Sequence, residues 1–273
     1  MILSRAIRHL KQQHWTGVFI ELVIVILGVF IGLQVENWNQ ARQNRAAEIV
    51  YLQALSKDFD SIQTSVQAQI DFEMTIARDI NRSLDEIDAP PSKDRTLRLG
   101  MLLGQLVARS TLKIESPTFQ ELQSSGHLGL IRDRALRGSI VEYFFQIRRW
   151  ESALDRNNEV FVDNGFDVFL RTHGVELALW DPAVMNGPSA LPPMFATDYQ
   201  KLMHAQYGDR ILAGRNPVLD RPPGDPFWDR LRQQLNWRAI IAGRNEIIAM
   251  HIKKMTETVT EKTRTYLKGD RSR

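Results

Sequence analysis

One apolar stretch near the N-terminus constrains this chain more than any other feature. Between Trp15 and Trp38 the sequence reads WTGVFIELVIVILGVFIGLQVENW, and the only charge from Val18 to Val35 is that of Glu21. The two tryptophans lie 23 positions apart, which is roughly 35 Å of α-helix and matches a bilayer core with a little of each interface. Both indole rings can then serve as interface anchors. We therefore predict a transmembrane helix at 15–38.

Two other structures share this pattern, namely the buried helix of a soluble core and a cleaved signal peptide. The wholly apolar run from Leu22 to Leu33 is short for a membrane span, which keeps both alternatives open. A signal peptide, however, ends in small residues at its cleavage site, and the polar segment ENWNQARQNR after Val35 has no A-x-A pattern. An uncleaved membrane helix is the preferred interpretation.

The basic residues around this helix predict its orientation. Residues 1–14 carry Arg5, Arg8 and Lys11 without an acidic residue, whereas Arg42 and Arg45 follow closely on the other side. A short basic tail before the first apolar segment favours a cytoplasmic N-terminus. We predict a short cytoplasmic tail at 1–14 and export of everything after the helix.

One face of the predicted membrane helix is small and polar. On a helical wheel Gly17, Glu21, Gly28 and Gly32 fall within about 60° of one another, and the last two form a G-x-x-x-G pair. Close approach of two copies would pack this face and give Glu21 a partner, so we predict a homo-oligomer through the transmembrane helix. The alternative is that the glycines are incidental and Glu21 reaches the cytoplasmic interface by snorkelling.

The rest of the chain has the apolar spacing of helices. Apolar residues recur every three or four positions from Ile49 to Ile87, with no glycine or proline between Gly32 and Pro90, so the membrane helix and this long amphipathic helix are expected to be continuous. Ala89-Pro90-Pro91-Ser92 should end it. Further helices are predicted at 97–107, after the Ser116-Pro117 cap, from Asp133 to about Leu170 with a break near Gly165, and from Pro226 to Leu267.

No alternating run rich in Val, Ile or Thr occurs outside the apolar stretch, which argues against strands. The predicted fold is all-α: a transmembrane helix continuous with a long amphipathic helix, and an antiparallel helical bundle. Residues 39–268 would form the exported domain, with 269–273 as a tail. A long Pro-rich loop at about 182–226 holds eight of the eleven prolines, and such loops often carry binding sites.

Composition excludes several kinds of chemistry. The absence of cysteine removes thiolate metal sites and cysteine nucleophiles, and a net charge of +3 with scattered basic residues gives no footprint for nucleic acid. His173 and Glu176 are one helical turn apart but lack a second matching pair, so we predict no metal site and no cofactor. Familiar catalytic fingerprints are also missing from the sequence.

One part of the Pro-rich loop could hold catalytic groups. Asp198, Tyr199, His204 and Asp209 occur close together there and could bind a cation or transfer a proton. Solvated loop residues would give the same pattern. A membrane-tethered hydrolytic or metal-dependent enzyme using the Asp198 to Asp209 region is therefore the alternative function.

Two stretches carry a family resemblance. IELVIVILGVFIGLQVENWNQ at 20–40 is similar to the membrane helix of a group of uncharacterised bacterial single-pass membrane proteins, domain of unknown function family six-zero-nine-zero, with Glu21, Gly28, Asn37 and Trp38 at the matching positions. TFQELQSSGHLGLIRDRALR at 118–137 resembles the stretch of that family in which a glycine turn joins two helices. Together they cover under a quarter of the chain.

The resemblance implies a topology and no activity. It places the protein in the bacterial inner membrane, with a single pass, the N-terminus in the cytoplasm and the C-terminal domain in the periplasm or outside the cell. Together with the missing catalytic motifs, this favours a non-enzymatic scaffold or sensor-like interaction module. Its expected partners are the lipid bilayer, a second copy of the chain and a protein that the sequence does not identify.

Overall fold

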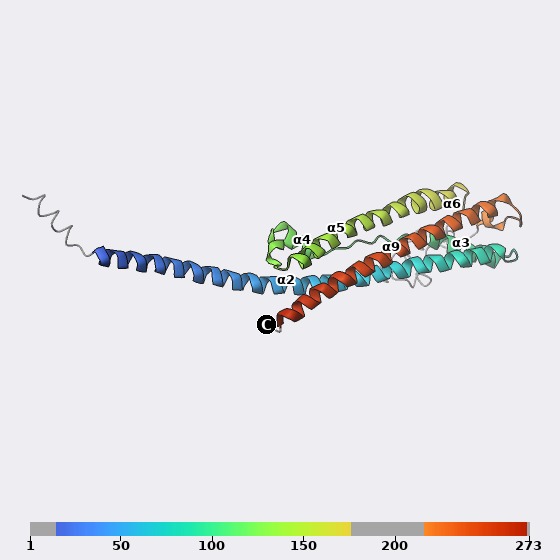
Figure 1. The fold of residues 1–273 in the computed structure, drawn as a ribbon. Coiled ribbons are helices and arrows are strands. Elements are labelled where there is room, and N and C mark those ends of the chain that lie inside the picture. Colours follow the sequence, from blue (N-terminus) through green and yellow to red (C-terminus); the bar gives the residue numbers. More distant parts are fainter. Residues whose placement is uncertain (1–14, 176–215, 272–273) are drawn as a thin grey trace, which may run out of the picture.

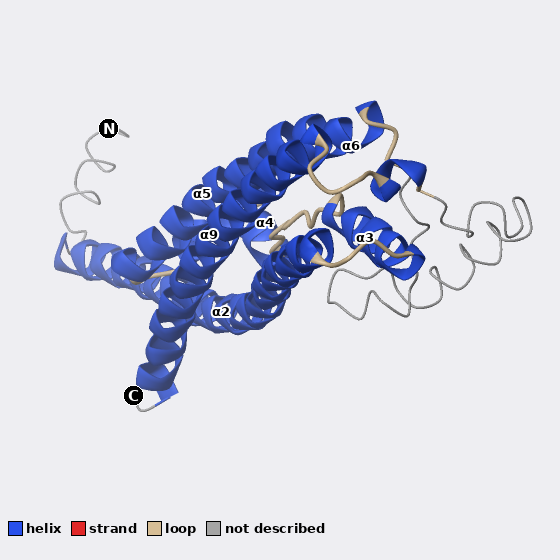
Figure 2. Cartoon of the chain, turned by 90° about the vertical axis from the view of Figure 1, so that its right-hand side faces the viewer, coloured by secondary structure: helices blue, strands red, loops and turns tan. Residues whose placement is uncertain are grey.

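The computed structural model describes residues 15–175 and 216–271. These two ranges contain helices, turns and short connections but no strand, as Figure 2 shows. The predicted all-α fold class is therefore confirmed. Most of the Pro-rich loop and the tail at 1–14 lie outside the described residues.

Helix α2 (Trp15–Asp88) organises the whole structure. It has 74 residues, or roughly 110 Å at 1.5 Å per residue, and it runs without interruption from the apolar stretch into the bundle. Its first part, which includes residues 19–35 and which we call the apolar segment, projects beyond the other helices with its side chains exposed (Figure 1). The helix ends just before Pro90 and Pro91, as predicted from the restriction that proline places on the preceding residue.

Two long helices pack along the remainder of α2. Helix α9 (Pro226–Arg271) runs antiparallel beside it, and helix α5 (Arg134–Asn157) lies against α9 (Figure 1). Both begin at an aspartate whose carboxylate accepts backbone N–H bonds of the first turn: Asp133 from Ala135 and Leu136, and Asp225 from Phe227. These caps satisfy donors that a helix start would otherwise leave open.

Two short helices complete the bundle. After the turn at Pro90, helix α3 (Lys93–Leu106) packs back along α2. Helix α4 (Pro117–Ser124) begins at the predicted cap, where Ser116 Oγ accepts a hydrogen bond from the Phe119 N–H. Gly126 follows α4 at φ 74°, a left-handed conformation that favours glycine, and leads into the 3₁₀ turn η1 (His127–Leu130).

The expected break near Gly165 is wrong. Helix α5 continues as a π-helix, η2 (Asn158–Asp167), and then as α6 (Val168–Thr172), so the change begins at Asn158 and the chain stays helical. Buried residues recur here at a spacing of four. The residues are Asn158, Val162, Phe166 and Leu170.

The core has two parts along the length of the bundle. We call the end from which the apolar segment emerges the stem end, and the opposite end the far end. The stem-end cluster joins α2, α4, α5 and α9, and includes Leu55, Phe59, Phe119, Tyr143, Phe144 and Ile252. The far-end cluster joins α2, α3, η2, α6, the 3₁₀ turn η3 (Pro217–Asp220) and α9, and includes Phe72, Ile76, Leu103, Phe166, Leu219 and Phe227.

Candidate functional site

The predicted packing face lies open on the apolar segment. Glu21, Gly28, Gly32 and the interface residue Trp38 are all exposed. A Cβ atom added at Gly28 or Gly32 would meet nothing within 4 Å, so no described part of the chain covers this face. For Trp15 and Gly17 the structure describes only the helical backbone.

The glycine face points away from the bundle. Leu55, which is fully buried, follows Gly28 by 27 positions, or about seven and a half turns, and therefore lies on the opposite side of α2. Ala46 follows Gly28, and Val50 follows Gly32, by 18 positions each, which is about five whole turns. Both are exposed, and the Val50 side chain is 63% exposed. An uncovered face thus continues along α2 from the apolar segment into the bundle.

A buried carboxylate joins three elements at the stem end. Glu48 is fully buried on α2, and its Oε1 accepts hydrogen bonds from the Arg132 N–H and from the Tyr266 hydroxyl, each at 2.8 Å. Arg45 pairs with the other oxygen of Glu48 and also donates to the Tyr266 hydroxyl. These bonds tie α2 to the segment before α5 and to the end of α9.

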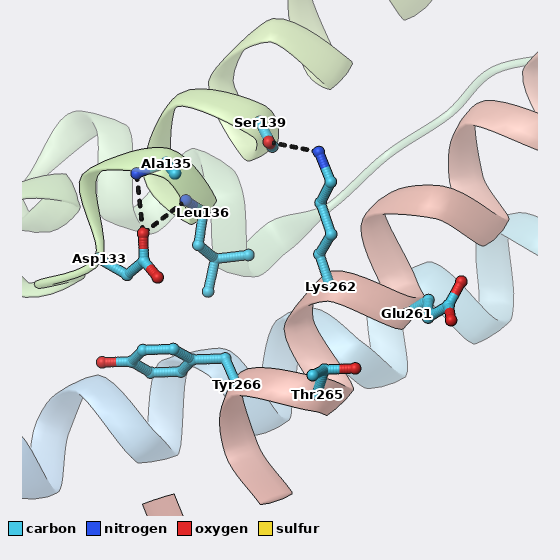
Figure 3. Close-up of a pocket in the computed structure, with 8 residues that line it drawn as sticks. All are labelled: Asp133, Ala135, Leu136, Ser139, Glu261, Lys262, Thr265 and Tyr266. Carbon is cyan, nitrogen blue, oxygen red and sulfur yellow. Dashed lines mark hydrogen bonds between the residues drawn. The ribbon is translucent and has the colours of Figure 1, made fainter. Parts of the chain in front are cut away.

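A pocket of about 440 Å³ lies beside this cluster, between the start of α5 and the end of α9 (Figure 3). Its lining combines apolar Leu136 and the Tyr266 ring with charges of both signs, from Asp133, Glu261 and Lys262. The carboxylate of Asp133 caps α5, and Lys262 donates to Ser139 Oγ at 2.9 Å. The charges that line the pocket are therefore partly engaged in the fold, and they select neither an anion nor a cation.

The most unusual feature of the interior is a set of polar residues between the two core clusters. We call it the polar layer: Gln69, Glu73, Asn157, Asn158, Arg238 and Asn245. Glu73 is 1% exposed, and its Oε1 accepts bonds from Gln69 Nε2 at 2.8 Å and Asn245 Nδ2 at 3.2 Å. Asn245 Nδ2 also donates to Asn158 Oδ1, and Asn157 Nδ2 donates to Asn245 Oδ1.

Burial changes the protonation of the two charged members. Removal from water raises the pKa of Glu73 to about 7, an effect that the nearby Arg238 and the bonds from Asn245 and Gln69 only partly offset. Burial also lowers the pKa of Arg238 to about 10, so its guanidinium stays charged at neutral pH. Arg238 donates to the carbonyl oxygens of Leu106 and Ala108 at 2.9 and 3.1 Å.

The residues predicted for catalysis are not placed. Asp198, Tyr199, His204 and Asp209 lie outside the described residues, as does Glu176 of the histidine–glutamate pair. His173 is described, and its Nδ1 lies 2.8 Å from the Phe169 carbonyl oxygen. Within the two described ranges, no group of three histidine or carboxylate residues could hold a metal ion.

The polar layer and Glu48 did not emerge from the sequence as functional residues, although a signal was present. Glu48 precedes Leu52, Leu55 and Phe59 in the same buried register of α2, and Glu73 follows Val66 in it. A carboxylate in an apolar register is a buried charge that needs partners. Those partners lie on helices that are far away in the sequence, so the sequence pattern alone does not identify them.

Together these features define a class of protein: an all-α chain in which, over residues 15–175 and 216–271, one helix is long and apolar enough to cross a membrane. The most apolar window of α2 has a mean hydropathy of 2.2, and none of it is buried within the structure. No protein-family model matches the chain, nor does any curated protein or solved structure. The resemblance to domain of unknown function family six-zero-nine-zero stays a prediction.

Proposed function

We propose that this chain is a non-enzymatic, single-pass membrane protein whose helical bundle acts as a scaffold or sensor-like interaction module, and which pairs with a second copy through α2. The observation that carries the proposal is the position of the glycine face. It lies on the side of α2 opposite to Leu55 and to the rest of the bundle. A second copy can therefore approach α2 from this open side without colliding with the bundle of either copy.

The chemistry of this face suits close helix packing in a membrane. Gly28 and Gly32 let two backbones approach, and association in lipid depends on such van der Waals packing and on polar contacts. Glu21 on the same face would find a hydrogen-bond partner in the second copy. A charged group inside the bilayer costs several kcal/mol when it is left alone.

The proposed location follows from the same helix. An exposed apolar segment of this length is unfavourable in water, because apolar surface costs about 25 cal/mol per Å² when it stays hydrated. Burial in a bilayer removes that cost. The basic tail at 1–14 supports an inside N-terminus, which puts the bundle outside the cytoplasm; the bacterial inner membrane comes from the family resemblance alone.

Single-cysteine crosslinking can test the pairing, because the natural chain contains no cysteine. Val50→Cys places a thiol on the proposed interface, and Arg148→Cys, on the exposed side of α5, is the matched control. In native membranes, mild oxidation should convert the Val50→Cys protein, and not the control, into a covalent dimer. Equal crosslinking of both variants, or none at Val50→Cys, would contradict the proposal.

A second measurement addresses the glycines directly. Replacing Gly28 and Gly32 by isoleucine in the Val50→Cys chain should reduce the covalent dimer several-fold, because the added side chains hold the two helices apart. The double substitution adds apolar volume to an exposed face and should leave the bundle folded. Unchanged dimer formation would show that the glycines are incidental.

A further inference from the structure

The polar layer lies where the two halves of the core meet. Along α2 the stem-end cluster ends at Ile70 and the far-end cluster begins at Phe72, so Gln69 and Glu73 flank the boundary. Along α9 the far-end cluster ends at Ala242 and the stem-end cluster begins at Ala249, with Asn245 between them. The bundle therefore has a polar cross-section between two apolar ones.

The hydrogen-bond inventory of this layer does not balance for an ionised Glu73. Its Oε2 and the Oε1 of Gln69 are buried acceptors without a hydrogen-bond partner among the described residues. A proton on the Glu73 carboxyl group would turn one surplus acceptor into a donor. The neutral acid therefore fits the layer better than the carboxylate does.

The charges around Glu73 do not remove this preference. From α9, Arg238 favours the carboxylate and Glu246 disfavours it. Arg238 makes its hydrogen bonds to the backbone carbonyls of Leu106 and Ala108, and its Nη1 has no partner in the described ranges. The remaining neighbours, Gln69 on α2, Asn245 on α9 and Asn158 on η2, are neutral.

The helix beside the layer changes its geometry at the same level. Asn158, which is bonded to Asn245, is the first residue of the π-helix η2, and its Nδ2 donates to the Ser110 carbonyl oxygen at 3.0 Å. Wide π-turns are rare in proteins, and those that do occur are often found at functional sites. One side-chain network thus connects the carboxyl group of Glu73, the start of η2 and the segment after α3.

We propose that the polar layer is a proton-controlled joint, which holds the far half of the bundle closed when Glu73 is neutral and releases η2 when Glu73 loses its proton. An ionised Glu73 needs water or additional donors that the closed layer does not provide. Opening at η2 admits water to the carboxylate and breaks the Asn245–Asn158 bond. The joint is independent of whether the chain pairs through α2.

Hydrogen–deuterium exchange of the full-length protein in nanodiscs tests the joint. Protection of peptides from η2, after correction for the intrinsic exchange rate, should fall by up to tenfold per pH unit between pH 5 and pH 7 and then level off. This slope follows from the release of one proton on opening. Peptides from α5 at 136–147, in the stem half, should show no matching change.

Two variants separate Glu73 from other acids. Glu73→Gln keeps the shape of the side chain and cannot ionise, so the η2 profile should become flat relative to wild type. Asp71→Asn removes an exposed carboxylate two residues away and should keep the wild-type profile. Other buried acids, such as Asp79 and Glu151, contribute equally to all three proteins and cancel in the comparison.

Each outcome decides the proposal. A steep η2 profile in wild type and Asp71→Asn that is lost in Glu73→Gln supports the joint. A flat η2 profile in wild type overturns it without any variant, and so does a steep profile that persists in Glu73→Gln. If Glu73→Gln does not fold, Glu73→Met replaces it, since methionine has a similar length and no titratable group.

Discussion

The guanidinium of Arg132 donates a hydrogen bond from Nη2 to the carbonyl oxygen of Ala41 at 3.1 Å. This bond reaches from the segment before α5 to a part of α2 only three residues beyond Trp38. With Glu48, which accepts from the backbone N–H of the same Arg132, it fixes the level at which α2 enters the bundle. The segment before α5 is thus hydrogen-bonded to α2 directly next to the apolar segment.

Loss of the Glu48 carboxylate should destabilise the bundle. In Glu48→Ala the Arg45 guanidinium, the Tyr266 hydroxyl and the Arg132 N–H all lose the carboxylate as an acceptor. Breaking one partner of a buried charged pair costs about 3–5 kcal/mol. Denaturant unfolding followed by circular dichroism in detergent should report a loss of this size.

The matched control for this change is Glu121→Ala. Glu121 accepts a hydrogen bond from the Tyr51 hydroxyl at the same end of the bundle, but it is exposed. We expect a loss below about 1 kcal/mol, as is usual for exposed polar contacts. Similar losses of unfolding free energy in the two variants would mean that the buried Glu48 stabilises the stem end no more than an exposed polar contact does.

Side-chain truncation to alanine should change the free energy of unfolding differently on the two faces of α2. Leu55→Ala removes a fully buried side chain of the stem-end cluster and should cost about 2–5 kcal/mol. Val50→Ala, on the exposed face, should change the free energy of unfolding of the monomer by less than about 0.5 kcal/mol. Comparison of the two by denaturant unfolding at low protein concentration checks that the bundle lies on the Leu55 side.

Stability should depend on pH through Glu73. Its pKa is about 7 in the folded chain, above its ordinary value of 4.5, so the folded state binds the proton more tightly than the unfolded state does. The stabilisation is fully present below pH 4.5 and is lost as the pH rises to about 7. It amounts to about 3 kcal/mol at 1.36 kcal/mol per unit.

The measurement is the free energy of unfolding between pH 4.5 and pH 8, for wild type and Glu73→Gln. The difference between the two curves isolates Glu73, because the other acids are common to both. Glu73→Gln should lose stability less steeply than wild type across this range. Parallel curves would indicate that Glu73 is already hydrated in the folded protein.

The proposed orientation is tested by a reporter at the C-terminus. Alkaline phosphatase folds and is active only outside the cytoplasm, so its fusion after Arg273 should be active, and a fluorescent protein that requires the cytoplasm should stay dark. Replacing Arg5, Arg8 and Lys11 with glutamine removes the positive charge of the tail and should weaken the preference for a cytoplasmic N-terminus. An inactive phosphatase on the unaltered chain would reverse the proposed topology.

Much of the fold could be predicted because it depends on local signals. The spacing of apolar residues, the prolines at 90 and 91 and the Ser116 cap each act within a turn or two of helix, and each occurs in the structure as expected. The π-helix at Asn158–Asp167 was not predicted. Apolar spacing and local propensity do not distinguish a π-turn from the α-helix on either side of it.

The candidate site depended on contacts that are far apart in sequence. Glu73 meets Asn245 and Glu48 meets Tyr266 only because α9 returns antiparallel to α2 over their whole shared length. A sequence shows that a carboxylate stands in an apolar register, but not which donor reaches it. That Gly28 and Gly32 share one face follows from the spacing within a single helix, whereas the direction of this face relative to the bundle required the structure.

The absence of glycine and proline between Gly32 and Pro90 has a mechanical consequence. An α-helix without such residues resists torsion, so a turn of the apolar segment about its own axis carries Leu55, Glu73 and Asp88 round with it. The far end of α2 lies roughly 80 Å from Val35, and α9, α3 and α4 all pack directly on this helix. Rotation, as much as displacement along the axis, is thus a movement that this protein can pass from one end to the other.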